Sequence, residues 1–100
     1  MDFKLVWTQE ALNNLEEILD YLILNWSQKE IIQFKQKLAR QIDLIIQFPK
    51  MFPVSAYNAE LRKAVLSKQT NLFYKIKGNK IYLVYIFVNA RDIKKIKQSK

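Results

Sequence analysis

Residues 72–85 read Leu-Phe-Tyr-Lys-Ile-Lys-Gly-Asn-Lys-Ile-Tyr-Leu-Val-Tyr, and this stretch decides the fold. Two runs rich in β-branched and aromatic residues flank Gly78-Asn79, which is typical of a β-hairpin. Glycine at the first central position favours a two-residue type II′ turn, whose twist matches that of the strands. The resulting register pairs Ile76 with Ile81, Tyr74 with Leu83 and Leu72 with Tyr85 on one face, and Lys75 with Tyr82 and Phe73 with Val84 on the other.

The strand after the turn is predicted at the centre of a sheet. Residues 81–88 are apolar on both faces, so neighbouring strands should lie on both sides. The hairpin face that carries Tyr74 and Tyr85 is wholly apolar or aromatic and should pack against helices. The opposite face mixes a lysine with aromatic residues and is therefore a candidate binding surface. A further strand is predicted at residues 62–66.

Upstream of the hairpin, the sequence predicts one strand and two helices. Residues 3–7 alternate as a short strand, and Thr8 after them is a good helix N-cap. From Ala11 to Trp26, apolar residues recur at three- and four-residue spacings, as in an amphipathic helix. Ser27-Gln28-Lys29-Glu30 has the form of a capping box that opens a second helix, which Pro49 ends. The short connection predicts an antiparallel helical hairpin.

The predicted fold is α+β: an N-terminal strand, an antiparallel helical hairpin and then a three-stranded antiparallel sheet, in one domain that covers residues 1–100. Residues 49–60 contain two prolines and follow no period. We expect a loop there, with Met51, Phe52 and Val54 tucked under the edge of the domain.

Positive charge is concentrated at one end of the chain. Residues 1–60 hold 6 Lys/Arg and 8 Asp/Glu, whereas residues 61–100 hold 11 Lys/Arg and one acid, Asp92. The whole net charge of +8 therefore belongs to the second part. This split predicts a scaffold half and a cationic half that meets an anionic partner.

The residues that are missing exclude several function classes. Without His or Cys, and with one Gly, the chain has no Ser-His-Asp triad, Cys-His pair, usual zinc site or glycine-rich phosphate loop. We expect no cofactor and no metal, because the acids are scattered over helix faces. The longest apolar run, residues 81–88, is far shorter than the roughly 20 residues of a transmembrane helix. The start does not resemble a secretory signal, so a cytoplasmic protein without a membrane segment is expected.

The candidate anion-binding residues come from the cationic part of the chain. They are Arg62, Lys63, Lys68, Lys75, Lys77, Arg91, Lys94 and Lys95. In a nucleic-acid interface these groups would neutralise phosphates beside stacking aromatic rings. Lysines on strands also serve simply to discourage edge-to-edge pairing. Sheet geometry could bring the guanidinium groups of Arg62 and Arg91 onto one surface, or each could pair locally with Glu60 and Asp92.

A family resemblance emerges from motifs spread over nearly the whole chain. They are Val6-Trp7-Thr8, the Leu15 to Leu22 pattern, Phe48-Pro49, Arg62 opening a strand, Phe73-Tyr74-Lys75-Ile76, and Arg91 after the last strand. Together they resemble the RelE/ParE toxin superfamily of bacterial toxin-antitoxin modules, and the helical hairpin with its Val-Trp-Thr start looks closer to the ParE branch. The resemblance implies a growth-inhibiting protein of the kind linked to plasmid stabilisation. It also implies a cognate acidic antitoxin, with which the chain would form a hetero-oligomer.

Two targets are implied by the resemblance. ParE-like members poison DNA gyrase by binding, with no catalytic constellation to preserve. RelE-like members cut mRNA on the ribosome, a metal-independent endoribonuclease reaction in which Arg62 and Arg91 would match the catalytic basic pair. Many RelE-like members add a Tyr or His near the C-terminus, but this chain has neither after Val88, and a lysine of ordinary pKa replaces them poorly. ParE-like gyrase inhibition is therefore favoured, and a non-toxic basic nucleic-acid-binding module is the alternative from another class.

Overall fold

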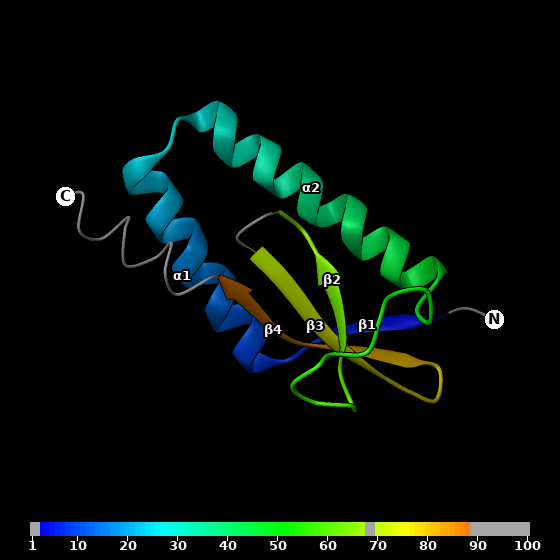
Figure 1. The fold of residues 1–100 in the computed structure, drawn as a ribbon. Helices are drawn as coiled ribbons and strands as arrows, with labels where there is room; N and C mark the ends of the chain where they lie inside the picture. Colours follow the sequence, from blue (N-terminus) through cyan, green and yellow to red (C-terminus); the bar gives the residue numbers. More distant parts are fainter. Residues whose placement is uncertain (1–2, 68–69, 89–100) are drawn as a thin grey trace.

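The computed structural model describes residues 3–67 and 70–88. Along the chain, the elements are β1 (Lys4–Trp7), α1 (Gln9–Asn25), α2 (Gln28–Gln47), β2 (Arg62–Val65), β3 (Thr70–Lys77) and β4 (Lys80–Val88). Both helices lie on one side of the sheet and diverge from their common turn like the arms of a V (Figure 1). The described part is thus a two-layer α+β fold, as the sequence predicts.

The four strands form one mixed sheet in the order β1-β4-β3-β2. β4 lies between β1 and β3, which confirms that the apolar strand is central. β1 pairs with β4 in parallel, with Leu5 beside Ile81, whereas β2-β3 and β3-β4 are antiparallel. The sequence predicts a three-stranded antiparallel sheet, whereas the structure has a four-stranded mixed sheet, because the N-terminal strand joins it as its fourth member.

The hairpin turn confirms the predicted geometry. Lys77 pairs with Lys80 across the two-residue turn, and Gly78 has a φ of +63°. Among the described residues no non-glycine residue has a positive φ, so Asn79 does not. Positive φ at the first central residue alone is the type II′ signature.

The predicted hairpin register holds as far as Tyr74 and Leu83 and then fails. A register shift between Phe73 and Tyr74 pairs Phe73 with Tyr85 and Leu72 with Ile86. The predicted pairs of Phe73 with Val84 and Leu72 with Tyr85 are wrong, because a bulge adds one residue to β4. Tyr85 therefore leaves the core face, to which the sequence assigned it.

The bulge occurs where the pairing of β4 with β1 ends and β4 comes into contact with the start of α1. The Thr8 hydroxyl lies 2.8 Å from the carbonyl oxygens of both Leu83 and Val84, and the Ile86 N–H donates to Asn14 Oδ1 at 3.0 Å. β1 does not extend beside this part of β4, so the backbone groups of β4 have no strand partner on that side. Side chains from the start of α1 form hydrogen bonds with them instead.

The core lies between the helices and the sheet. Ala11 of α1, Leu38 and Ile45 of α2, and the strand residues Ala64, Leu72, Tyr74, Ile81, Leu83 and Ile86 form one buried cluster. Burial of these apolar side chains supplies the main favourable free energy of folding. Neither helix of the described part combines the length and apolarity needed to cross a membrane.

Side-chain caps start both helices as predicted. The Thr8 hydroxyl accepts a hydrogen bond from the Ala11 N–H, and Ser27 and Glu30 form the reciprocal capping box. The following loop differs from expectation. Phe52 is half-buried against Tyr74, but Met51 and Val54 are 57% and 48% exposed, so these two residues are not tucked under the domain edge.

Candidate functional site

The candidate site is the sheet face that points away from the helices, which we call the outer face. Strand register assigns its side chains, because paired residues project from the same side. It comprises Lys4, Val6, Lys63, Val65, Asn71, Phe73, Lys75, Lys77, Lys80, Tyr82, Tyr85 and Phe87. The alternate strand positions face the helices and contribute the core cluster.

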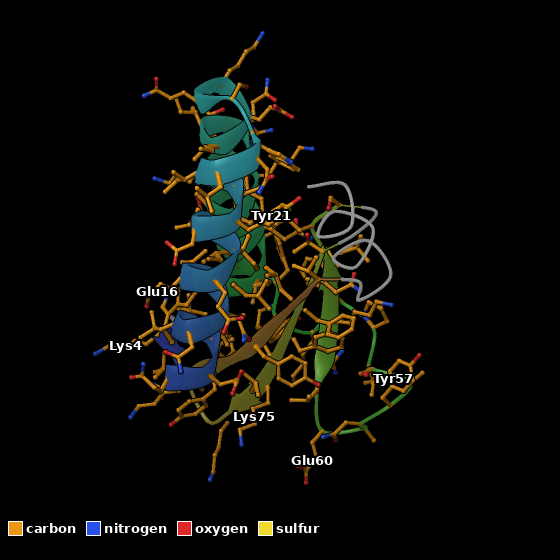
Figure 2. The ribbon with its side chains drawn as sticks, turned by 90° about the vertical axis from the view of Figure 1, so that its left-hand side faces the viewer. Lys4, Glu16, Tyr21, Tyr57, Glu60 and Lys75 are labelled. Carbon is orange, nitrogen blue, oxygen red and sulfur yellow. The ribbon has the colours of Figure 1, made fainter. Side chains whose placement is uncertain are left out.

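The outer face is cationic because its lysines have no acidic neighbours along the strands. All five of its charged residues are lysines, and no Asp or Glu occurs within β1, β2, β3 or β4. Figure 2 places Lys4 and Lys75 in the lower half of the molecule, together with Tyr57 and Glu60 and away from the helical turn. Positive potential from such a cluster attracts an anionic partner over about one Debye length, ~8–10 Å at physiological salt.

Aromatic rings lie among these lysines. The rings of Phe73 and Tyr85 pack with centroids 4.9 Å apart, and Lys75 Nζ lies 5.9 Å from the centre of the Tyr82 ring. Tyr82 and Tyr85 are half-buried, and Phe87 is 47% exposed. This arrangement offers partly exposed π faces next to ammonium groups, which suits contact with a protein or with unpaired bases.

Arg62 lies on the opposite side of the sheet from these lysines. It pairs with the buried Tyr74, so its side chain projects toward the helix layer. Its Nη1 donates to the backbone carbonyls of Lys50 at 3.2 Å and Phe52 at 2.6 Å. The guanidinium group therefore holds the loop that follows α2.

Tyr74 holds the same loop from within the core. Its hydroxyl donates a 2.6 Å hydrogen bond to the Pro49 carbonyl, and its ring makes an edge contact with Phe52. Burial raises the pKa of Tyr74 to about 12, with the Arg62 charge partly opposing this effect. The phenol is therefore neutral at physiological pH and acts here as a donor, not as an acid-base catalyst.

The residues singled out from the sequence fall into three groups. Lys63, Lys75 and Lys77 come together on the outer face, whereas Arg62 does not join them. The other candidates lie outside the described residues; they are Lys68, Arg91, Lys94 and Lys95. Sequence reasoning placed Tyr85 in the core because nothing in an all-apolar strand marks a bulge. It also left out Lys4 and Lys80, which the predicted hairpin and a parallel β1 would together have placed on this face.

A groove borders the outer face along β2, the edge strand of the sheet. It has a volume of about 470 Å³ and is lined by Gln41 of α2, Phe52, Pro53, Val54 and Ala56 of the loop, and Lys63 and Val65 of β2. Its lining is mainly apolar. No group of three or more possible His, Cys, Asp or Glu metal ligands occurs among the residues described.

Comparisons with known proteins agree with this architecture. A family model described as the ParE toxin of the type II toxin-antitoxin system parDE matches residues 5–94. No protein with a curated description matches the chain by sequence.

Solved structures of toxin-antitoxin proteins share the fold. The chromosomal ParDE system from P. aeruginosa superposes with a TM-score of 0.74 at 19% identity, covering 87% of this chain and 96% of that one. The E. coli DinJ-YafQ complex gives 0.63 at 11% identity over 91% and 97% of the two chains. The RelBE2 complex from Mycobacterium tuberculosis gives 0.56 at 11% identity over 89% and 100%.

Proposed function

The chain belongs to the ParE toxin family of type II toxin-antitoxin systems, and we propose that it arrests growth by binding DNA gyrase while a cognate antitoxin holds it inactive. The antitoxin proposal is supported by the similar ParDE, DinJ-YafQ and RelBE2 structures, which are toxin-antitoxin systems or complexes. The choice of gyrase rests on how the basic residues are used.

The observation that carries the gyrase proposal is the position of Arg62. A guanidinium group that cleaves RNA must reach the phosphate in the transition state. Arg62 instead donates to two backbone carbonyls on the helix-facing side, away from the lysines of the outer face. A structural arginine is compatible with inhibition by binding, whereas the RelE-like mechanism would need this group at the reacting atoms.

The outer face supplies the contact surface for this proposal. It combines lysines with tightly packed aromatic rings, and aromatic residues are enriched where protein interfaces bury their centres. Gyrase acts on DNA, so a cationic surface can meet both the protein and its phosphate-rich substrate. The lysines would steer association, and the aromatic rings would provide most of the buried area.

Ribosome-dependent mRNA cleavage is the second candidate, and one observation favours it. Lys63, Lys75 and the rings of Tyr82 and Tyr85 lie on the same face, which resembles a platform for unpaired bases. Basic side chains alone can stabilise the charge of a phosphoryl transition state. This candidate requires that the outer face, without Arg62, perform the reaction.

Two assays with the purified chain separate the candidates. In the first, gyrase and plasmid DNA are incubated with the chain, and covalent gyrase-DNA cleavage complexes are counted. In the second, a translation extract is examined for new mRNA ends within the ribosomal A site. We expect cleavage complexes to accumulate and mRNA to remain intact. New mRNA ends without any effect on gyrase would reject the proposal in favour of the second candidate.

A further inference from the structure

Three lysines lie side by side at the hairpin end of the outer face, and we call them the lysine row. Lys80 of β4 pairs with Lys77 of β3 on one side and with Lys4 of β1 on the other. The Lys4 N–H donates to the Asn79 carbonyl at 2.9 Å, so the start of β1 is fixed beside the hairpin turn (Figure 1). Because paired residues project from the same side and neighbouring strands lie about 4.8 Å apart, the row spans roughly 10 Å.

The lysine row is unfavourable for folding. Like charges that lie directly opposite each other in a sheet destabilise it. The row contains two such contacts, Lys77 with Lys80 and Lys80 with Lys4. All three side chains are exposed, and within residues 3–67 and 70–88 none of the ammonium groups has a salt-bridge or hydrogen-bond partner. An anion that lies across the row would remove this repulsion.

Protection of a sheet edge does not account for the whole row. Lysines at edges discourage pairing with another chain. Lys4 belongs to the edge strand β1, and Lys77 lies beyond the part of β3 that pairs with β2, so both can serve this purpose. Lys80 has a paired strand on each side. Its charge repels both neighbours and protects no edge, which points to a role in binding.

The outer face changes in character away from the lysine row. Farther along β4, its residues on this face are Tyr82, Tyr85 and Phe87. The ring of Phe73 packs on that of Tyr85. Aromatic residues are enriched and lysine is depleted in protein interfaces, whereas lysine and arginine are common partners of phosphate oxygens. The row therefore fits phosphates, and the aromatic part of the face fits a protein.

The composition of the row also favours a nucleic-acid duplex over a single strand. Proteins bind single strands by stacking the unpaired bases on aromatic rings, and the row consists of lysines alone. A DNA duplex keeps its bases stacked inside and presents one phosphate charge about every 1.7 Å along its axis. Three ammonium groups on flexible stems, spread over roughly 10 Å, can therefore each reach a phosphate.

We propose that Lys4, Lys77 and Lys80 bind the phosphate backbone of duplex DNA. The row then holds the DNA on which gyrase acts, while the aromatic part of the outer face contacts gyrase. Phosphate contacts carry no sequence information, so the row binds duplexes of any sequence. The inference rests on the proposed function for the role of this contact, but the contact itself is measured without gyrase.

Fluorescence anisotropy of a labelled duplex DNA oligonucleotide measures its binding to the purified chain over a series of salt concentrations. The row variant combines Lys4→Gln, Lys77→Gln and Lys80→Gln, which remove the charges and keep polar side chains. Its thermal unfolding should occur at or above the wild-type temperature, because two like-charge contacts are lost. Weak binding by this variant is then not a result of misfolding.

The matched control combines Lys29→Gln, Lys35→Gln and Lys37→Gln. These lysines are exposed on α2, in the helix layer on the other side of the sheet (Figure 1). The control changes the net charge by the same amount as the row variant, so a difference between the two reports the position of the charges.

We expect the row variant to bind the duplex at least ~10-fold more weakly at low salt, and the slope of log K against log salt to become shallower by about 3, because nearly one counterion is released per phosphate contact. The control should keep nearly the wild-type slope. Equal losses in the row variant and the control would show that only net charge matters and would overturn the proposal. A wild type without affinity for duplex DNA would also overturn it.

A duplex RNA of the same sequence is titrated in parallel. Row-dependent binding of this RNA, without binding of the DNA, would assign the row to a ribosomal partner and overturn the proposal. Failure of the proposed function has a different result. If the row binds DNA and the wild type forms no gyrase-DNA cleavage complexes, gyrase inhibition is wrong and the DNA contact stands. If cleavage complexes form but DNA binding does not depend on the row, the reverse holds.

A second measurement locates the DNA without any substitution. Backbone amide shifts of the chain are followed by NMR as the duplex is added. We expect the amides of Lys4, Lys77 and Lys80 to shift most. Shifts concentrated at Phe73 and Tyr85 would place the DNA on the aromatic rings and contradict the proposal.

Discussion

The hydroxyl of Tyr74, at the centre of the core, donates a 2.6 Å hydrogen bond to the backbone carbonyl of Pro49, where the chain leaves α2. Arg62, the neighbour of Tyr74 across β2 and β3, holds the next residues of the same loop. Two side chains of the sheet therefore fix the loop that forms one wall of the β2 groove. The arrangement links the stability of the core to the shape of this groove.

Replacement of Tyr74 by Phe tests this link. It leaves the buried Pro49 carbonyl without its donor, so we expect the free energy of unfolding to fall by about 1–3 kcal/mol. Chemical denaturation of the wild type and Tyr74→Phe at pH 7 measures the difference. An equally stable variant would show that the hydrogen bond contributes nothing.

The raised pKa of Tyr74 predicts a pH dependence. Because the folded-state pKa of about 12 lies above the model value of 10.0, the neutral phenol is favoured by folding. Its contribution is present below pH 10 and declines as the pH rises toward 12. The wild type should therefore lose more stability across this interval than Tyr74→Phe does. Parallel losses in denaturation series at both ends of the interval would contradict this assignment.

Replacement of Arg62 by Lys separates a structural role from a catalytic one. Both carbonyl contacts come from the single nitrogen Nη1. The lysine side chain is shorter and does not bring its ammonium group to the same position, so we expect a loss of about 1 kcal/mol in stability. Gyrase inhibition per folded molecule should persist. A fall in activity by orders of magnitude with unchanged stability would instead place the guanidinium group at a reacting phosphate.

The Thr8 hydroxyl is predicted to be important for stability, because it caps α1 and contacts the β4 bulge. Replacement of Thr8 by Val keeps the shape of the side chain but removes these hydrogen bonds. We expect a loss of about 1–2 kcal/mol, within the range for N-cap substitutions, measured by thermal unfolding. Ser27→Ala is a useful comparison, since among the described residues the side-chain hydrogen bonds of this exposed cap are made with Glu30 of the same helix.

The outer face predicts a salt-dependent contribution from Lys75. We expect Lys75→Met, which keeps most of the aliphatic stem, to weaken association with the gyrase-DNA complex by a few-fold at low salt, with a smaller effect at high salt. Lys37→Met, on the exposed surface of α2, is the matched control. Equal effects of the two substitutions would indicate that only net charge matters.

Much of this fold follows from local sequence signals. The capping box at Ser27, the stop at Pro49 and the type II′ turn at Gly78 depend on neighbouring residues, so the sequence predicts them correctly. The bulge in β4 is not predicted from neighbouring residues, because it depends on Thr8 and Asn14, which are more than 70 residues away. Because the strand is apolar throughout, no alternation of polar and apolar residues shows that the side chains after the bulge point to the opposite face.

The site was harder to predict than the fold for a similar reason. Lys75 lies on the face that the hairpin register predicts as a binding surface. The sequence pattern assigned no face to Lys63 and grouped it with Arg62 as an anion-binding residue. Arg62 is the neighbour of Lys63, and adjacent side chains of a strand point to opposite faces, so Arg62 lies on the other side of β2. Its role then depends on how the loop after α2 returns over the sheet edge, which composition and spacing do not encode.

The most direct test of the account is the count of covalent gyrase-DNA cleavage complexes formed with the purified wild-type chain and with Arg62→Lys. The account predicts that both proteins increase these complexes to a similar extent per folded molecule, and that neither produces mRNA ends in a translation extract. Ribosome-dependent mRNA cleavage that disappears in Arg62→Lys, with no change in gyrase complexes, would contradict it.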